Sequence, residues 1–218
     1  MTAKVILFDF DGTIADTLDA IVNITNSLAG EFGYKPASQE QLAQIQNSKP
    51  RELIKESGIS IFKIPFLFRR VKLELNKEIQ ELSPIPGIKE ALIELKNQGH
   101  RLGIITSNSQ ENVIAFLFKN ELRNLFDFVY SAKTLFGKNK VITNFLRQEG
   151  LKFEDVIYVG DETRDIEAAR KSNIKVISVS WGFNSKEVLA EQNPDFLIYQ
   201  PNELIDVIGS LQQVGIPR

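Results

Sequence analysis

The chain has 218 residues, of which 43% are hydrophobic and 25% are charged, which predicts a folded protein with an ordinary core. Its net charge of -2 offers no basic surface for nucleic acid or an anionic membrane, and the lack of cysteine excludes disulfides and thiolate chemistry. Apolar runs stay below the roughly 20 residues of a membrane helix, so we expect a cytoplasmic protein, whose oligomeric state the sequence leaves open.

Residues 5–8 predict a buried strand, because a short run of apolar β-formers ends abruptly at acidic residues. Asp9 and Asp11 leave this strand end on the same side, since side chains at i and i+2 share a face. Two anions held there need a cation, and Mg²⁺ is a hard ion that carboxylates bind. Asp-Gly is also a common turn signal, but the Asp-x-Asp-Gly-Thr string directly after a strand favours a functional role for the two acids over a turn or a helix cap.

Residues 16–82 show helical patterns without a convincing strand, and we interpret them as a small helical cap domain inserted after the first strand. The predicted helices cover 18–32, 39–46, 51–57 and about 66–82. Pro84 and Pro86 suit a stiff return linker. Residues 1–15 and 83–218 would then form a Rossmann-like core.

From residue 83 onward, strand and helix signals alternate with short connections, which predicts a doubly wound, parallel α/β sheet. The further strands are expected at 101–106, 128–130, 156–159, 176–179 and 196–198, and the helices at 87–97, 112–118, 140–148 and 163–171. Such sheets bind ligands beyond the carboxyl ends of their strands. His100 follows Gly99 in a predicted turn, where we expect an exposed histidine rather than a catalytic one.

Polar residues follow the next predicted strand as Thr106, Ser107 and Asn108. Backbone N–H groups and hydroxyls at such a helix start suit a phosphate oxygen, although these residue types are also ordinary helix caps. Lys138 follows Gly137 in a loop, and a lysine that reaches a phosphoryl group would neutralise its charge. Lys140 is a second candidate, and the position after Gly137 favours Lys138.

Asp161 and Asp165 follow the strongly apolar strand at 156–159, one at the strand tip and one a turn into the next helix. Both could reach one metal ion or its waters, although Asp165 or Glu162 could simply favour the positive end of the helix. Acids, hydroxyls and a lysine thus stand at the ends of several strands. Together they form one coherent phosphoryl-transfer site.

These strings resemble the signatures of the haloacid dehalogenase superfamily, in its phosphatase branch and near the phosphoglycolate-phosphatase-like group. The resemblance implies that Asp9 is a nucleophile that forms an aspartyl-phosphate, and that Asp11 is the general acid and base. It implies that Thr106 holds the transferring phosphoryl group, and that Lys138 steadies the nucleophile and that phosphoryl group.

The same resemblance implies a Mg²⁺ site made by Asp9, the backbone carbonyl of Asp11 and Asp161, with Asp165 in contact with the ion either directly or through another ligand. The expected function is a Mg²⁺-dependent phosphatase for a small phosphorylated metabolite. A sugar phosphomutase that uses the same intermediate is an alternative. A second alternative is a non-catalytic binding protein whose residues 62–70 form a patch that binds a partner, a membrane or nucleic acid. We expect the phenylalanines of 62–70 to build the core of the cap instead.

Overall fold

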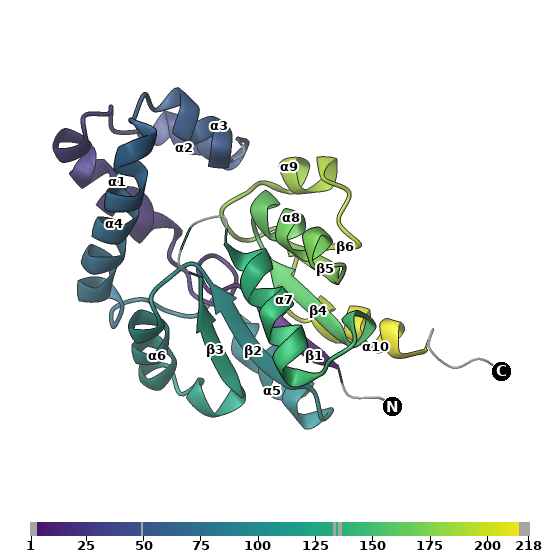
Figure 1. The fold of residues 1–218 in the computed structure, drawn as a ribbon. Helices are drawn as coiled ribbons and strands as arrows, with labels where there is room; N and C mark the ends of the chain where they lie inside the picture. The colour runs from purple at the N-terminus through teal and green to yellow at the C-terminus, as the bar shows by residue number, and fades with distance from the viewer. Residues whose placement is uncertain (1–3, 49, 133, 135–136, 214–218) are drawn as a thin grey trace.

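The computed structural model describes residues 4–48, 50–132, 134 and 137–213, and it confirms the predicted Rossmann-like α/β fold (Figure 1). Parallel strands form one sheet in the order β3-β2-β1-β4-β5-β6. Their bounds are β1 (Val5–Phe8), β2 (Arg101–Thr106), β3 (Phe128–Ser131), β4 (Val156–Gly160), β5 (Lys175–Val179) and β6 (Phe196–Ile198). The winding direction reverses at β1, and ligands bind at such switch points in α/β sheets.

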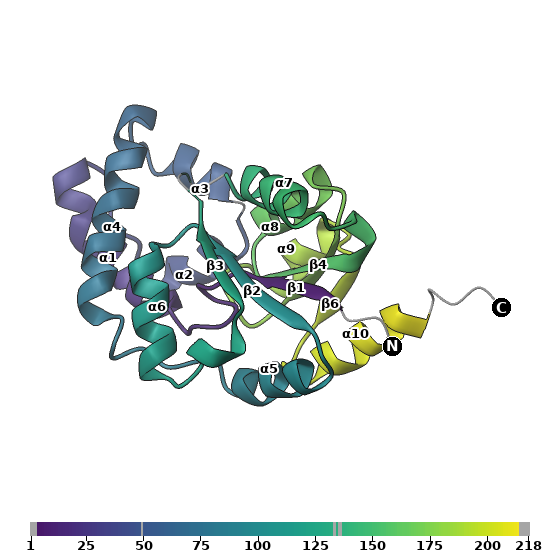
Figure 2. The ribbon, with the colours of Figure 1, turned by 60° about the horizontal axis from the view of Figure 1, so that its bottom comes forward.

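Helices cover both faces of the sheet because alternate strand residues point to opposite sides. Val5 and Leu7 pack with residues of α7 and α8, whereas Ile6 and Phe8 pack with residues of α5, α6 and α10. Figure 2 shows α7 and α8 above the sheet and α5 and α10 below it. The bounds are α5 (Ile88–Asn97), α6 (Gln110–Lys119), α7 (Lys138–Glu149), α8 (Thr163–Lys171), α9 (Lys186–Glu191) and α10 (Glu203–Gln213). Among the described residues, no helix combines the length and apolar character needed to cross a bilayer.

Between β1 and α5 the chain forms helices that lie to one side of the sheet, and we call residues 16–82 the helical segment (Figure 1). Its helices are α1 (Leu18–Phe32), α2 (Gln39–Gln46), α3 (Pro50–Glu56) and α4 (Ile64–Glu78). The chain leaves and returns at one place, since the backbone N–H of Asp16 donates to Ser83 O at 3.0 Å and that of Ile85 to Ile14 O at 2.8 Å. That this segment is a separate cap domain stays a prediction.

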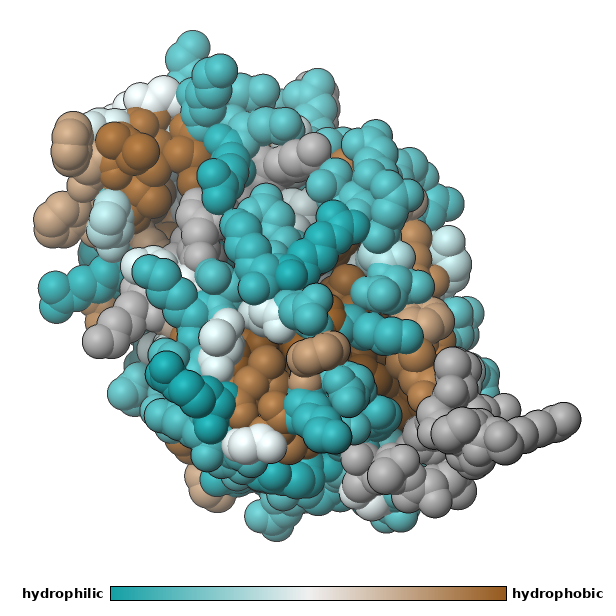
Figure 3. Space-filling model, turned by 45° about the vertical axis from the view of Figure 1, so that its right-hand side comes forward, coloured by the Kyte–Doolittle hydropathy of each residue, from teal (hydrophilic) through white to brown (hydrophobic). Residues whose placement is uncertain are grey.

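Two phenylalanines at the start of α4 and just before it are exposed, contrary to expectation. Phe62 and Phe66 are 82% and 68% exposed, so the expectation that the phenylalanines of 62–70 build a cap core is wrong for these two. The face of α4 that packs inward carries apolar residues at a spacing of four, namely Leu67, Val71 and Leu75. Phe66 lies one position off that face and therefore points to solvent. Figure 3 shows hydrophobic residues gathered at the upper left, over the helical segment.

His100 is buried, so the expectation of an exposed histidine is wrong. It directly precedes β2, which lies beside β1 in the sheet, and its Nδ1 accepts a hydrogen bond from the backbone N–H of Lys4 at 3.0 Å. The residue stands at the amino ends of these strands, away from the edge where α/β sheets bind ligands. Its role in the fold is therefore to join the starts of two neighbouring strands.

Candidate active site

Three central strands bring the predicted site residues to one edge of the sheet. Phe8 at the end of β1 is in register with Ile104 of β2 and with Val159 of β4. The residues that follow these positions therefore emerge next to one another, although they are far apart in the sequence. The polar residues buried there include Asp9, Asp11, Thr106, Ser107, Asn108, Asp161 and Asp165.

Three of these carboxyl groups form a compact buried cluster. Asp9, Asp161 and Asp165 each offer one oxygen, and the three oxygens lie within 4.8 Å of one another. Burial and the neighbouring negative charges raise the pKa of Asp161 well above its ordinary value. Burial, and the negative charges of Asp9 and Glu162, raise the pKa of Asp165 to about 6 against the opposing charge of Lys138. Crowded carboxylates of this kind, with oxygen as the sole donor element, fit a hard divalent cation.

Lys138 is the lysine that contacts this cluster. Its Nζ donates to a carboxyl oxygen of Asp9 and to Asp165 Oδ1, the latter at 2.6 Å. Burial disfavours the ammonium, but the carboxylates of Asp165 and Asp9 outweigh it and raise the pKa of Lys138. The side chain arrives there because α7 begins at Lys138, after Gly137, whereas Lys140 is exposed.

Asp11 stands outside the cluster of three and has a partner of its own. Both of its carboxyl oxygens accept from Asn108 Nδ2, at 3.0 and 3.1 Å. Burial and then the charge of Asp9 raise the pKa of Asp11 to about 7. A carboxyl group with such a pKa can give up and take back a proton near neutral pH. The side chain of Asn108, expected to face a phosphate, thus contacts Asp11.

Thr106 and Ser107 present buried hydroxyl groups beside these acids. Thr106 Oγ1 accepts from the backbone N–H of Asn108 at 2.9 Å. Ser107 Oγ accepts from Arg164 Nη1 at 3.2 Å, and Arg164 Nε donates to Glu162 Oε2 at 2.6 Å. Because each hydroxyl accepts in these bonds, its own proton stays available for a phosphate oxygen. From the sequence, Glu162 was considered only as an acid at the positive end of its helix, and Arg164 was given no role, although both charges lie inside the motif that runs from Asp161 to Asp165.

Asp161 is oriented by residues whose contribution sequence reasoning also missed. Thr13 Oγ1 donates to Asp161 Oδ1 at 2.7 Å, and the backbone N–H of Phe183 donates to Oδ2 at 2.8 Å. Gly12 adopts φ +72°, and a Cβ atom there would lie 2.3 Å from Asp161 Oδ2. The Gly-Thr pair after Asp11 was therefore a signal for close approach to a second strand end.

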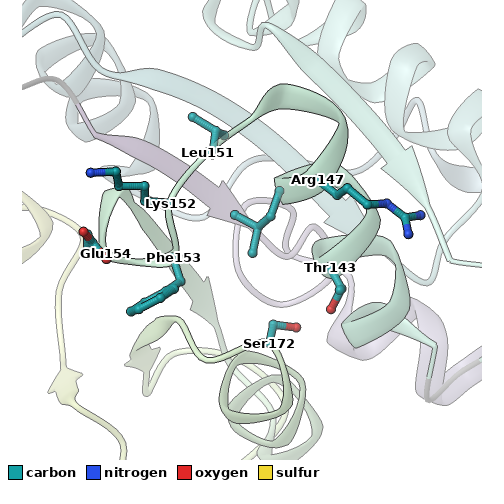
Figure 4. Close-up of a pocket in the computed structure, with 8 residues that line it drawn as sticks. Thr143, Arg147, Leu151, Lys152, Phe153, Glu154 and Ser172 are labelled. Atoms are coloured by element: carbon teal, nitrogen blue, oxygen red, sulfur yellow. The ribbon is translucent and has the colours of Figure 1, made fainter.

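A pocket of about 530 Å³ lies apart from all of these residues, near the ends of α7 and α8 (Figure 4). It is lined by Thr143, Leu146, Arg147, Leu151, Lys152, Phe153, Glu154 and Ser172. None of the predicted site residues is in this lining. The buried charged groups, rather than this pocket, define the candidate active site, because convergent titratable groups are what phosphoryl transfer requires.

Comparison with known proteins agrees with this geometry. A family model described as haloacid dehalogenase-like hydrolase matches residues 6–179. Phosphoglycolate phosphatase from Synechococcus elongatus is 35% identical over 96% of this chain and 99% of its own length. Pyrophosphatase PpaX from Bacillus cereus is 24% identical over 98% of this chain and 100% of its own length. The crystal structure of a predicted phosphatase from Clostridium acetobutylicum is similar to this chain with a TM-score of 0.82 at 23% identity. The match covers 96% of this chain and 100% of that one.

The chain belongs to the haloacid dehalogenase-like hydrolase family. The resemblance inferred from the strand-end motifs is therefore confirmed. The predicted enzyme class, a phosphatase of this family, is confirmed as well.

Proposed function

We propose that the protein is a Mg²⁺-dependent phosphatase that hydrolyses a small phosphomonoester resembling phosphoglycolate, through a phosphoryl group carried on Asp9. The observation that carries the proposal is the arrangement around Asp9, where Lys138 bonds one carboxyl oxygen beside Asp161 and Asp165. The 35% identical phosphoglycolate phosphatase supports the substrate class. The net charge of -2 supports a small metabolite rather than nucleic acid as the partner.

The nucleophile is Asp9, whose carboxylate is held in one orientation. Its Oδ1 accepts from the backbone N–H of Phe10 at 2.7 Å, and its Oδ2 accepts from Lys138 Nζ. Attack forms a bond from a carboxylate oxygen to phosphorus as the bond to the leaving oxygen breaks. Asp11 gives its proton to that oxygen, and it later takes a proton from the water that releases inorganic phosphate.

The remaining residues neutralise and orient the phosphoryl group. The hydroxyls of Thr106 and Ser107 donate to its oxygens, and the charge of Lys138 offsets their negative charge. Asp9, Asp161 and Asp165, with the backbone carbonyl of Asp11, would hold Mg²⁺. A bound Mg²⁺ would supply positive charge beside the phosphoryl oxygens and lower their repulsion with the nucleophile.

Replacing the nucleophile tests this proposal. We expect Asp9→Asn to lower kcat for phosphoglycolate by at least about 10⁴-fold, as loss of a catalytic nucleophile does. Asp206→Asn, at an exposed position of α10, should leave turnover unchanged. EDTA should stop hydrolysis by the wild-type protein, and added Mg²⁺ should restore it.

The product distinguishes the alternatives. Release of inorganic phosphate indicates a phosphatase, whereas transfer to a second hydroxyl of a sugar phosphate indicates the phosphomutase. Hydrolysis by Asp9→Asn at the wild-type rate would refute the assignment of Asp9.

A further inference from the structure

A continuous chain of side-chain amides joins α4 of the helical segment to Asp11. Asn76 Nδ2 donates to Asn112 Oδ1 at 2.5 Å, and Asn112 Nδ2 donates to Asn108 Oδ1 at 3.0 Å. Asn108 Nδ2 then donates to both carboxyl oxygens of Asp11. A second bond, from Asn112 Nδ2 to Lys72 O at 3.1 Å, ties Asn112 to α4 again.

The direction of each amide in this chain is set by its partners. Asn108 Oδ1 accepts from the backbone N–H of Ser109 at 2.7 Å as well as from Asn112, so Nδ2 must face Asp11. Asn112 Nδ2 meets two acceptors, and a flipped amide would set its oxygen against the carbonyl of Lys72. Asn108 and Asn112 are 3% and 1% exposed, so water does not offer them alternative partners.

We propose that Asn108 and Asn112 are positioning residues that orient the carboxyl group of Asp11 for proton transfer, and that Asn76 makes this orientation depend on the place of α4. The inference rests on the proposed function, in which Asp11 is the general acid and base. Proton transfer requires a donor held within hydrogen-bond reach of the leaving oxygen, and two bonds from Asn108 restrict the carboxyl group to one orientation. Movement of α4 away from α6 breaks the bonds to Asn112 and loosens that restriction.

The leaving group of the substrate reveals a defect in acid catalysis. A p-nitrophenolate ion leaves without a proton, whereas the alkoxide of phosphoglycolate needs one, so poor positioning of Asp11 affects the second substrate more. In Asn112→Ala we expect kcat/KM for phosphoglycolate to fall by about 10²-fold and that for p-nitrophenyl phosphate to change by no more than about threefold. Asn108→Ala should behave alike, and Asn76→Ala should show a smaller change in the same direction.

A matched control comes from the opposite end of the same helix. Asn120 follows α6, and its Nδ2 donates a hydrogen bond to the backbone carbonyl of Phe116 at 3.0 Å. Asn120→Ala should leave both values of kcat/KM unchanged. In an Asp11→Ala background, Asn112→Ala should cause no further loss with phosphoglycolate, because the residue through which it acts is gone.

Equal losses with both substrates, or full additivity with Asp11→Ala, would overturn the proposal. If Asn112→Ala does not fold, Asn76→Ala decides the matter, since it alters an exposed side chain and leaves both buried asparagines in place. An unchanged ratio of the two kcat/KM values in that variant overturns the link to α4. A wild-type protein that hydrolyses neither phosphate overturns the proposed function itself and this inference with it.

Discussion

Among single residues, Lys138 carries most of the charge balance in the candidate site. Its ammonium group is buried between Asp9 and Asp165, and removing one partner of a buried ion pair costs about 3–5 kcal/mol. In the presence of a chelator, we expect Lys138→Met to lower the free energy of unfolding by about that amount. In a separate assay with Mg²⁺ present, we expect the same substitution to abolish hydrolysis. Urea denaturation measures the first effect. Lys140→Met alters an exposed lysine and should change neither property; equal effects of the two substitutions would contradict this account.

Sequence reasoning found the residues that end strands, because an apolar run that stops at an acid is a local pattern. Asp9 and Asp161 were predicted in this way. The choice between Lys138 and Lys140 depends on where α7 begins, which the spacing alone did not settle. The contact between Asn108 and Asp11 was not predicted, because the two residues lie 97 positions apart and no local pattern reports such a contact.

Among the elements, the helical segment meets the core at a second place besides Asn112. Asn184 is buried, and its Oδ1 accepts from the backbone N–H of Thr163 at 3.0 Å. Its Nδ2 donates to Gln46 O at 3.2 Å and to Ser48 O at 3.1 Å, which ties the end of α2 and the residues after it to the start of α8. These contacts hold the segment beside the loop that orients Asp161.

Breaking the Asn184 contact should loosen that part of the helical segment. A lost hydrogen bond contributes about 1 kcal/mol, so in Asn184→Ala we expect amide hydrogen exchange in α2 and α3 to rise by about fivefold. Exchange in β1 should stay unchanged. Asn144→Ala, at an exposed position of α7, is the control. Unaltered exchange in α2 and α3 would show that other contacts hold the segment.

The elements themselves were largely predictable. Each predicted strand lies within one residue of the observed bounds, because short apolar runs bounded by breakers are a strong signal. Helix α4 was expected at 66–82 and spans Ile64–Glu78, since Pro65 is tolerated in a first helical turn. Helices α9 and α10 were not predicted. The exposure of Phe66 was missed because residues 62–70 were interpreted as one apolar group, whereas the inward face of α4 carries Leu67, Val71 and Leu75.

For the molecule as a whole, the buried acids predict that metal binding stabilises the fold. A ligand present at about 100 times its dissociation constant adds about 2.7 kcal/mol if it binds only the folded state. For a chain of this size we expect Mg²⁺ at that level to raise Tm by about 5–10 °C in thermal unfolding. Asp161→Asn should remove the shift and Asp206→Asn should keep it. A Tm that does not respond to Mg²⁺ in the wild-type protein would argue against the proposed metal site.

The proposed mechanism depends above all on covalent attack by Asp9, and a variant that separates attack from hydrolysis tests this step most directly. In Asp11→Asn, p-nitrophenyl phosphate needs no proton for its leaving group, but the phosphorylated enzyme lacks the base that activates water. We predict a burst of p-nitrophenol equal to the amount of enzyme, followed by slow turnover. Mass spectrometry of the acid-quenched protein should find one phosphoryl group on the peptide that contains Asp9. A variant that turns over without a burst, or a phosphoryl group on another residue, would contradict the account.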